Sequence, residues 1–216
     1  MPNFFDSADI IKIFDRFNRS DLKYILLRNS YNELPDKLSI GKDIDILVDI
    51  NSKSLFHNIM QDMHFRKIRH PFKSKERLYG ANLFEMYKNK KGVLVDVNYE
   101  FCVQSLDKGQ LIPLDKKIQL NIWKNFKKVK YKNMNFNFMG NEEYFITMLS
   151  RLIYDKKEID LWHKKELTRL LSIVDFDLVT CYSNLIFFKY TNKLLRSIKN
   201  KNFTDFFGSY LTFYDY

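Results

Sequence analysis

The stretch "LSIGKDIDILVD", residues 38–49, sets acidic side chains into an otherwise apolar run. Because side chains alternate between the two faces of a strand, we expect Asp43 and Asp45 to point to one side and Ile44 and Ile46 to the other. Two carboxylates so close together repel each other, and a divalent cation would neutralise them. The pair therefore predicts a metal site, while the same spacing also arises by chance at exposed sheet edges.

A third carboxylate in the sequence strengthens the prediction of a metal site. Asp96 lies in the middle of the apolar run "VLVDVNYE", where an unpaired charge is costly to bury. If this strand lies beside the one that carries Asp43 and Asp45, all three carboxylates reach the same place. Three such groups on adjacent strands can hold the ions of a two-metal phosphoryl or nucleotidyl transfer site. We expect Asp49, at the end of the earlier strand, to cap the helix that follows.

The order of these motifs resembles the nucleotidyltransferase superfamily with the DNA polymerase beta-like fold. The matching features are a strand that ends in a turn, a loop, a strand with two Asp residues around one apolar residue, and a third Asp on a later strand. The resemblance covers about residues 20–101. It implies that Asp43, Asp45 and Asp96 are the catalytic and metal-binding residues, with Mg²⁺ or Mn²⁺ as cofactor and two ions bound.

The resemblance also implies where a substrate would bind. In "LLRNSYNELP" the family expects Gly and Ser at the turn, and this chain has Asn29 and Ser30. Asn tolerates the left-handed backbone that such a turn uses, although glycine lets a triphosphate come closer. With Arg28 before the turn and Lys42 in "SIGK", these side chains are the predicted substrate-binding residues.

Within the superfamily, the sequence pattern "LRN...LP...GKDIDILV" resembles bacterial nucleotidyltransferases encoded among surface-polysaccharide genes. It is also similar to the LicD-type phosphocholine transferases, whose Asp-rich motif is denser. This implies transfer of a nucleotidyl or phosphoryl group from a nucleoside triphosphate or another activated phosphate donor to an acceptor hydroxyl, on a sugar or glycan. Two alternatives stay open. The chain could be an inactive module of this fold that binds nucleic acid or a partner protein, or the aspartates could form a structural cluster.

Composition and charge bound the class of protein. The chain has 216 residues, of which 45% are hydrophobic and 16% aromatic, enough for a packed core. Its longest apolar runs fall well short of the ~20 residues of a membrane-spanning helix, and "MPNFFDSADI" lacks a basic region followed by an apolar stretch. We therefore expect a cytoplasmic protein. Cys102 and Cys181 lack metal-like spacing and are expected to be buried thiols.

The formal net charge of +10 favours partners that carry phosphate. Residues 116–132 hold seven lysines and no acid, a pattern equally typical of a solvated face. Arginine is sparse, so nucleic acid is kept as a partner but not favoured. The histidines show no ligand-like pairing and are expected to be surface or packed residues: His57, His64, His70 and His163.

The pattern of apolar residues predicts an α+β fold, with a mixed nucleotidyltransferase-type sheet and flanking helices, followed by a C-terminal helical part. Domains are predicted at 1–139 and 140–216. The aromatic segment 203–216 is expected to dock on the body or on a dimer partner. The predicted helices cover 7–19, 52–63, a segment from 141, 158–171 and 183–198, and the predicted strands lie near 22–29, 43–48, 65–70, 79–88, 93–101, 126–131 and 135–139.

Overall fold

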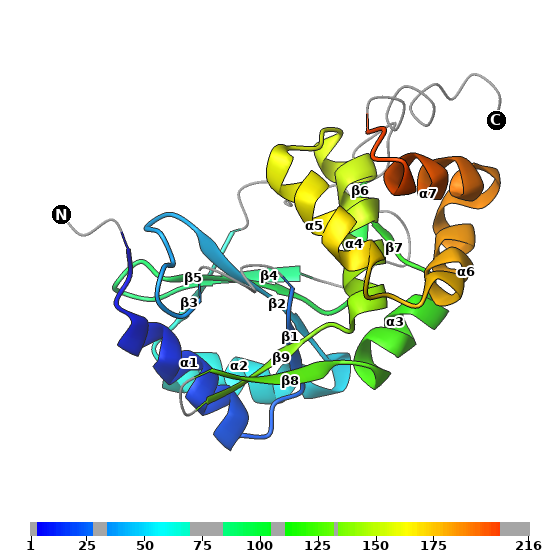
Figure 1. The fold of residues 1–216 in the computed structure, drawn as a ribbon. Coiled ribbons are helices and arrows are strands. Elements are labelled where there is room, and N and C mark those ends of the chain that lie inside the picture. The colour runs from blue at the N-terminus through cyan, green and yellow to red at the C-terminus, as the bar shows by residue number, and fades with distance from the viewer. Residues whose placement is uncertain (1–3, 28–33, 70–83, 105–110, 132–133, 204–216) are drawn as a thin grey trace. The chain divides into compact units, whose positions relative to one another are not determined.

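A computed structural model describes residues 4–27, 34–69, 84–104, 111–131 and 134–203 (Figure 1). The fold is of the α+β class, with a mixed sheet and flanking helices, as predicted. The chain forms two compact units. The first unit contains the described residues of 1–75, 80–101 and 125–139, and the second contains those of 102–124 and 140–216.

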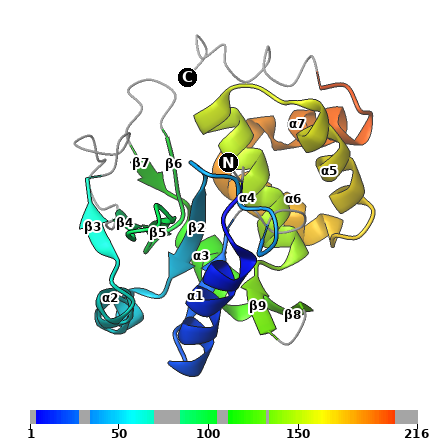
Figure 2. The same cartoon turned by 90° about the vertical axis from the view of Figure 1, so that its left-hand side faces the viewer.

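The first unit is built on a seven-stranded sheet of order β3-β4-β5-β2-β1-β9-β8. In this order β3 and β8 are the two edge strands, and they lie at opposite ends of the sheet (Figure 2). Parallel pairs join β2 to β5 and β1 to β9, and the other neighbours are antiparallel. The strands are β1 (Tyr24–Leu26), β2 (Asp43–Val48), β3 (Arg66–Ile68), β4 (Phe84–Lys88), β5 (Leu94–Asn98), β8 (Lys127–Tyr131) and β9 (Met134–Phe138).

Two helices, α1 (Ser7–Arg19) and α2 (Lys53–Asp62), lie on the same side of this sheet (Figure 1). Both are amphipathic, because their apolar residues recur three and four positions apart. Their apolar faces pack on the alternate residues of the strands, such as Ile44 and Val95, to form one core. The core residues from the helices are Ile10, Ile13, Phe14, Phe17, Phe56, Ile59 and Met60.

The second unit is mainly helical. It contains α3 (Lys116–Lys124), α4 (Asn141–Arg151), α5 (Leu161–Leu171), α6 (Phe176–Phe187), α7 (Thr191–Lys199) and a two-stranded sheet of β6 (Cys102–Gln104) and β7 (Leu111–Pro113). A π-helical turn, η2 (Leu152–Lys156), continues α4, and 3-10 turns precede α2 (η1, Ile50–Ser52) and α7 (η3, Phe188–Tyr190). Among the described residues, no helix is long and apolar enough to cross a membrane.

The C-terminal helices differ from the prediction in two ways. The single helix predicted over 183–198 is two helices, because the backbone of Phe188 turns to φ 48° and ψ −124°, outside the helical region, and ends α6. In the lysine run 116–132 only a strand near 126–131 is predicted, yet the first part of the run forms α3, whose Ile118 and Ile122 are fully buried. The predicted docking role of the aromatic tail falls on residues 204–216, outside the described part.

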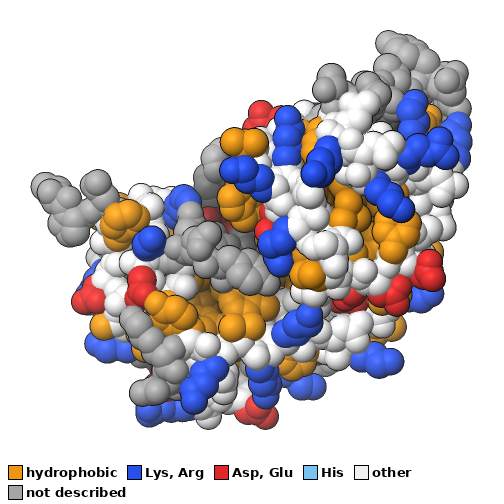
Figure 3. Space-filling model, in the orientation of Figure 1, with side chains coloured by type: hydrophobic (Ala, Val, Ile, Leu, Met, Phe, Trp, Pro, Cys, Tyr) orange, Lys and Arg blue, Asp and Glu red, His pale blue; other side chains and the backbone are white. Residues whose placement is uncertain are grey.

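Charged residues are spread widely over the surface. In Figure 3, lysine and arginine side chains occur over the whole drawn face, with acidic groups and apolar patches between them. Cys102 and Cys181 are predicted to be buried thiols, and both are thiols outside any disulfide, but each is only half-buried.

Candidate metal and phosphate-transfer site

The three predicted carboxylates lie together on one face of the sheet. Strands β2 and β5 run parallel, in a register that places Asp45 directly opposite Asp96. Asp43 lies two residues before Asp45 and so shares its face. One carboxylate oxygen from each of the three residues lies within 4.8 Å of the other two. The prediction that the three carboxylates meet required β5 to lie beside β2, and the structure shows this pairing.

The burial of these carboxylates is uneven. Asp45 and Asp96 are each only 3% exposed, whereas Asp43 is half-buried. The intervening Ile44 and Ile46 are fully buried in the core on the opposite face of the sheet. Holding negative charges together away from water costs free energy that a cation would offset.

The donor set fits a hard divalent cation. Three carboxylates supply only oxygen ligands, which Mg²⁺ and Mn²⁺ prefer. Oxygens this close to one another can share one ion or bridge two, since two-metal sites place their ions about 4 Å apart.

The approach to β2 is a tight turn. Gly41 has φ +92°, a conformation that glycine adopts without strain, and the backbone N–H of Lys42 donates to the carbonyl oxygen of Ser39 at 3.0 Å. This turn delivers Lys42, which is exposed, to the position immediately before Asp43. A phosphate near the carboxylates could therefore meet the Lys42 ammonium group.

The predicted turn after the first strand is only partly described. The backbone N–H of Leu27 donates to the carbonyl oxygen of Asp45 at 3.0 Å, so the chain leaves β1 beside the carboxylates. The predicted substrate-binding residues Arg28, Asn29 and Ser30 follow at once, and they lie outside the described residues.

At the other end of β2, Asp49 begins the 3-10 turn η1. Its Oδ1 accepts a hydrogen bond from the backbone N–H of Asn51 at 2.8 Å. Asp49 therefore caps the 3-10 turn that precedes α2, rather than α2 itself, whose N-cap is Ser52, and this side chain is not part of the carboxylate cluster.

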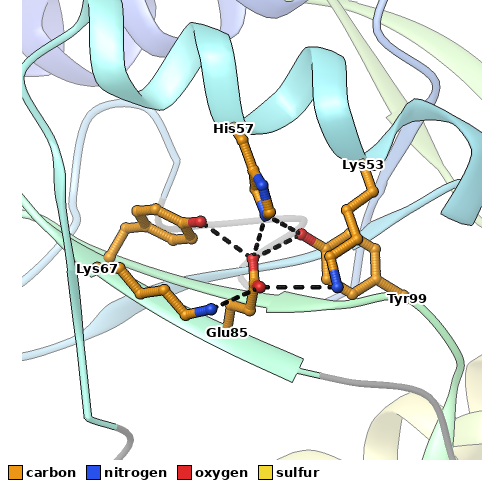
Figure 4. A network of polar contacts seen from close by, with 6 residues as sticks. Lys53, His57, Lys67, Glu85 and Tyr99 are labelled. Carbon is orange, nitrogen blue, oxygen red and sulfur yellow. Dashed lines mark hydrogen bonds and ion pairs between the residues drawn. The ribbon is translucent and has the colours of Figure 1, made fainter.

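A second buried carboxylate, Glu85 on β4, lies on the opposite face of the sheet (Figure 4). Its Oε1 accepts from Lys67 Nζ at 2.7 Å and lies 3.7 Å from Lys53 Nζ. Its Oε2 lies 2.7 Å from His57 Nε2 and accepts from the hydroxyl of Tyr99 at 2.8 Å. The hydroxyl of Tyr87 also donates to Oε2, at 3.0 Å.

This network sets the charge state of Glu85. Burial alone would raise the pKa of Glu85, but the hydrogen bonds from Lys67, Tyr99, His57 and Tyr87 outweigh it and lower the pKa to about 2. Burial, together with the Glu85 charge, raises the pKa of Tyr99 above its ordinary value, so this tyrosine stays a donor. Glu85 is therefore an anion. Through its hydrogen bonds and ion pairs it connects α2 and β3 to the β4–β5 hairpin, whose strand β5 carries Asp96.

Sequence reasoning missed this network. Glu85 interrupts the apolar run "LFEMY", which is the same signal that singled out Asp96. His57 was expected to be a surface or packed residue, and it is a half-exposed partner of Glu85. His163, also expected to be packed, is buried at the start of α5, where its Nδ1 lies 2.7 Å from Asp160 Oδ1.

The second unit holds a buried carboxylate of its own. Glu143, in the first turn of α4, is fully buried and accepts from the hydroxyl of Tyr182 on α6 at 2.9 Å. Burial and the bond to Glu143 raise the pKa of Tyr182. The sequence analysis recognised the start of the helix but not that this acidic residue would face the interior.

Comparisons with known proteins give no family assignment. No family model matches the chain, and no curated protein matches it. Among solved structures it is similar to the lincosamide antibiotic adenylyltransferase LnuA in its lincomycin-bound form, at 13% identity and TM-score 0.45, covering 80% of this chain and 100% of that one. A second is the antibiotic-resistance factor ANT(2'')-Ia, at 9% identity and TM-score 0.49, covering 90% of this chain and 95% of that one.

A third similar structure is a putative nucleotidyltransferase from Thermotoga maritima, at 18% identity and TM-score 0.45, covering 66% of this chain and 81% of that one. TM-scores below 0.5 do not by themselves establish a shared fold. The assignment of function therefore depends on the carboxylates and the strands that carry them.

Proposed function

We propose that this chain is a nucleotidyltransferase that uses Mg²⁺ or Mn²⁺ and transfers a nucleotidyl group from a nucleoside triphosphate to an acceptor hydroxyl. The observation that supports the proposal is the in-register pairing of Asp45 with Asp96, which gathers three carboxylates within 4.8 Å at one place. Clustered like charges of this kind are costly unless cations bind them, and phosphate transfer is the chemistry that such cations serve.

The proposed roles follow from position. Asp43, Asp45 and Asp96 hold two ions, which when bound neutralise charge on the phosphates. Lys42 and the segment of Arg28, Asn29 and Ser30 bind the phosphates of the donor. These residues align the donor and the acceptor, and this alignment lowers the entropic cost of the reaction.

The chemical step is a displacement at phosphorus. The acceptor hydroxyl oxygen forms a bond to the α-phosphorus, and the bond between that phosphorus and the bridging oxygen of the leaving group breaks. Pyrophosphate leaves with the electron pair, and Asp96 accepts the proton of the hydroxyl. We further propose a sugar or glycan as the acceptor and a cytoplasmic location. The acceptor extends the resemblance of the sequence to enzymes of surface-polysaccharide synthesis, and the location extends the expectation drawn from the short apolar runs.

The test is pyrophosphate release over a panel of nucleoside triphosphates and sugar acceptors with Mn²⁺, comparing the wild type with Asp45→Asn. We expect Asp45→Asn to lose turnover by about a thousandfold or more, since it weakens the cation site itself. The matched control is Asp62→Asn, which removes a carboxylate from an exposed ion pair with Arg16 and should leave turnover unchanged.

Thermal denaturation provides a readout that does not depend on turnover. Mn²⁺ should raise the melting temperature of the wild type and of Asp62→Asn but not of Asp45→Asn. In EDTA the Mn²⁺-dependent stabilisation of the wild type should disappear, because no cation is then left to bind the carboxylates. Full turnover by Asp45→Asn would contradict the proposal. The absence of any Mn²⁺ effect on the wild type would instead identify a structural cluster.

A further inference from the structure

The strand β8 forms an open edge of the seven-stranded sheet. It pairs with β9 on one side, and among the described strands none pairs with its outer side. All five of its residues, 127–131, are exposed. The backbone N–H and C=O groups along an open edge can pair with another extended chain.

The two faces of β8 differ in chemistry. Its register with β9 places Val129 opposite Phe136, a core residue, so Val129 and Tyr131 lie on the side of the sheet that α1 covers. Val129 is nevertheless 42% exposed and Tyr131 38% exposed. Together they form a small exposed apolar surface at the edge of the core.

The other face of β8 carries Lys128 and Lys130, which lie opposite Asn137 and Asn135 on β9. Asn135 is exposed and Asn137 is half-buried, so no apolar core covers this face. The two lysines lie two residues apart on an exposed strand, which separates their Cα atoms by about 7 Å. One face of β8 therefore carries Lys128 and Lys130, and the other carries Lys127 at its start, followed by Val129 and Tyr131.

We propose that an extended peptide with alternating acidic and apolar residues adds to the outer edge of β8 as a further strand. Residues two apart repeat at the same spacing in both strands, so alternate acids would lie beside Lys128 and Lys130. The residues between them would point to the other face and cover Val129 and Tyr131. Backbone hydrogen bonds to the free edge would provide the remaining affinity.

The same residues disfavour other occupants. Lysines along an edge repel a second copy of β8, because like charges would lie side by side. The phosphates of a nucleic acid could pair with the lysines, but a nucleic acid would not form β-sheet hydrogen bonds with the outward backbone groups of β8. The hydroxyl of Tyr131 also bonds to the carboxylate of Asp36, which holds this ring at the edge of the sheet rather than free for base stacking. An acidic strand matches both the charge and the backbone.

The test uses the full chain and fluorescence polarisation with a labelled peptide of alternating Glu and Val, about six residues long, the usual length of a strand. A second peptide of the same composition carries all its Glu residues before its Val residues. We expect the alternating peptide to bind about tenfold or more tightly than the block peptide, because only alternation satisfies both faces. Amide hydrogen exchange should slow within 127–131 when it binds.

A charge-reversed variant, Lys128→Glu with Lys130→Glu, should lose about tenfold or more in affinity for the alternating peptide. The matched control is Lys12→Glu with Lys23→Glu, which makes the same change in charge at exposed positions outside β8 and should bind normally. Equal binding of the block peptide, or an equal loss in the control, would overturn the proposal. Single-stranded RNA that protects the same amides as well as the peptide does would also overturn it.

Discussion

Asp45 and Asp96 show how strand pairing can create chemistry from residues far apart in the chain. Each carboxylate interrupts an apolar strand, and each is 3% exposed. An isolated buried charge would be lost to protonation or would destabilise the strand. Placed opposite each other and beside Asp43, they form a group of carboxylate oxygens that could hold a metal ion. A bound cation would offset the free-energy cost of burying them.

At Phe188 the backbone itself is strained. Its φ of 48° and ψ of −124° lie in a region that glycine tolerates and a bulky residue does not, and the residue is 64% exposed. Phe188→Gly should therefore raise the free energy of unfolding by about 1 kcal/mol, as measured by chemical denaturation.

The matched variant for this position is Phe188→Ala, which removes the same exposed ring but keeps Cβ and the strain. It should change stability by less than the glycine variant does. Equal stabilisation by alanine and glycine would show that the ring, not the backbone, is responsible.

At the scale of elements, the Glu85 network joins α2 and β3 to the β4–β5 hairpin. Lys53 and His57 reach Glu85 from α2, Lys67 reaches it from β3, and Tyr99 follows the end of β5 (Figure 4). Glu85 itself lies opposite Val97, next to Asp96 in the chain. The network thus holds the strand that presents Asp96, from the face opposite to the carboxylates.

Glu85→Gln should lower the free energy of unfolding at neutral pH by about 3 kcal/mol, because a buried anion with several donors is lost. The folded pKa of Glu85 is lowered from 4.5 to about 2, so its contribution is complete above pH 4.5 and is lost as the pH falls toward 2. Chemical denaturation at a series of pH values between 4.5 and 2 measures this contribution. As the pH is lowered, the free energy of unfolding should decrease more steeply for the wild type than for Glu85→Gln.

Asp15→Asn is the control for this prediction. It removes an exposed carboxylate that pairs with Arg19 on the same helix, and we expect a change below about 0.5 kcal/mol. If Glu85→Gln matched this control at neutral pH, the network would contribute nothing to stability.

The helices show which elements the sequence could predict. The amphipathic patterns of α1 and α4 were recognised, and α1 has the predicted bounds of 7–19. The spacing of apolar residues over 183–198 is continuous, so it did not reveal the break at Phe188. One residue with a non-helical backbone does not change the spacing of the apolar residues around it. The lysine content of 116–132 likewise concealed the helix α3, whereas the strand predicted near 126–131 is confirmed as β8.

For the whole molecule, the dominant electrostatic feature is the formal net charge of +10. Some ion pairs among the described residues, such as Arg19 with Asp15 and Arg16 with Asp62, are exposed on both sides, and such pairs contribute little. Mutual repulsion of the excess lysines should therefore outweigh them. Raising the ionic strength from low to physiological should increase the free energy of unfolding by about 0.5 kcal/mol, since salt screens this repulsion.

The variant with Lys12→Glu and Lys23→Glu tests this explanation. Each substitution lowers the net charge by two, so two of them lower it from +10 to +6, and the gain in stability with salt should shrink. Chemical denaturation at two ionic strengths measures the difference. A wild type that loses stability as salt is added would show that attractive pairs dominate instead.

The sequence by itself determined the local features of this protein. Alternation along a strand placed Asp43 and Asp45 on one face, and an apolar run marked Asp96 as a buried acid. These follow from the geometry of a few neighbouring residues. Only the tertiary structure decided that β5 lies parallel to β2 with Asp96 opposite Asp45, that Glu85 gathers its donors, and that β8 is an open edge. Such features depend on which strands pair over long separations, and local patterns do not encode that choice.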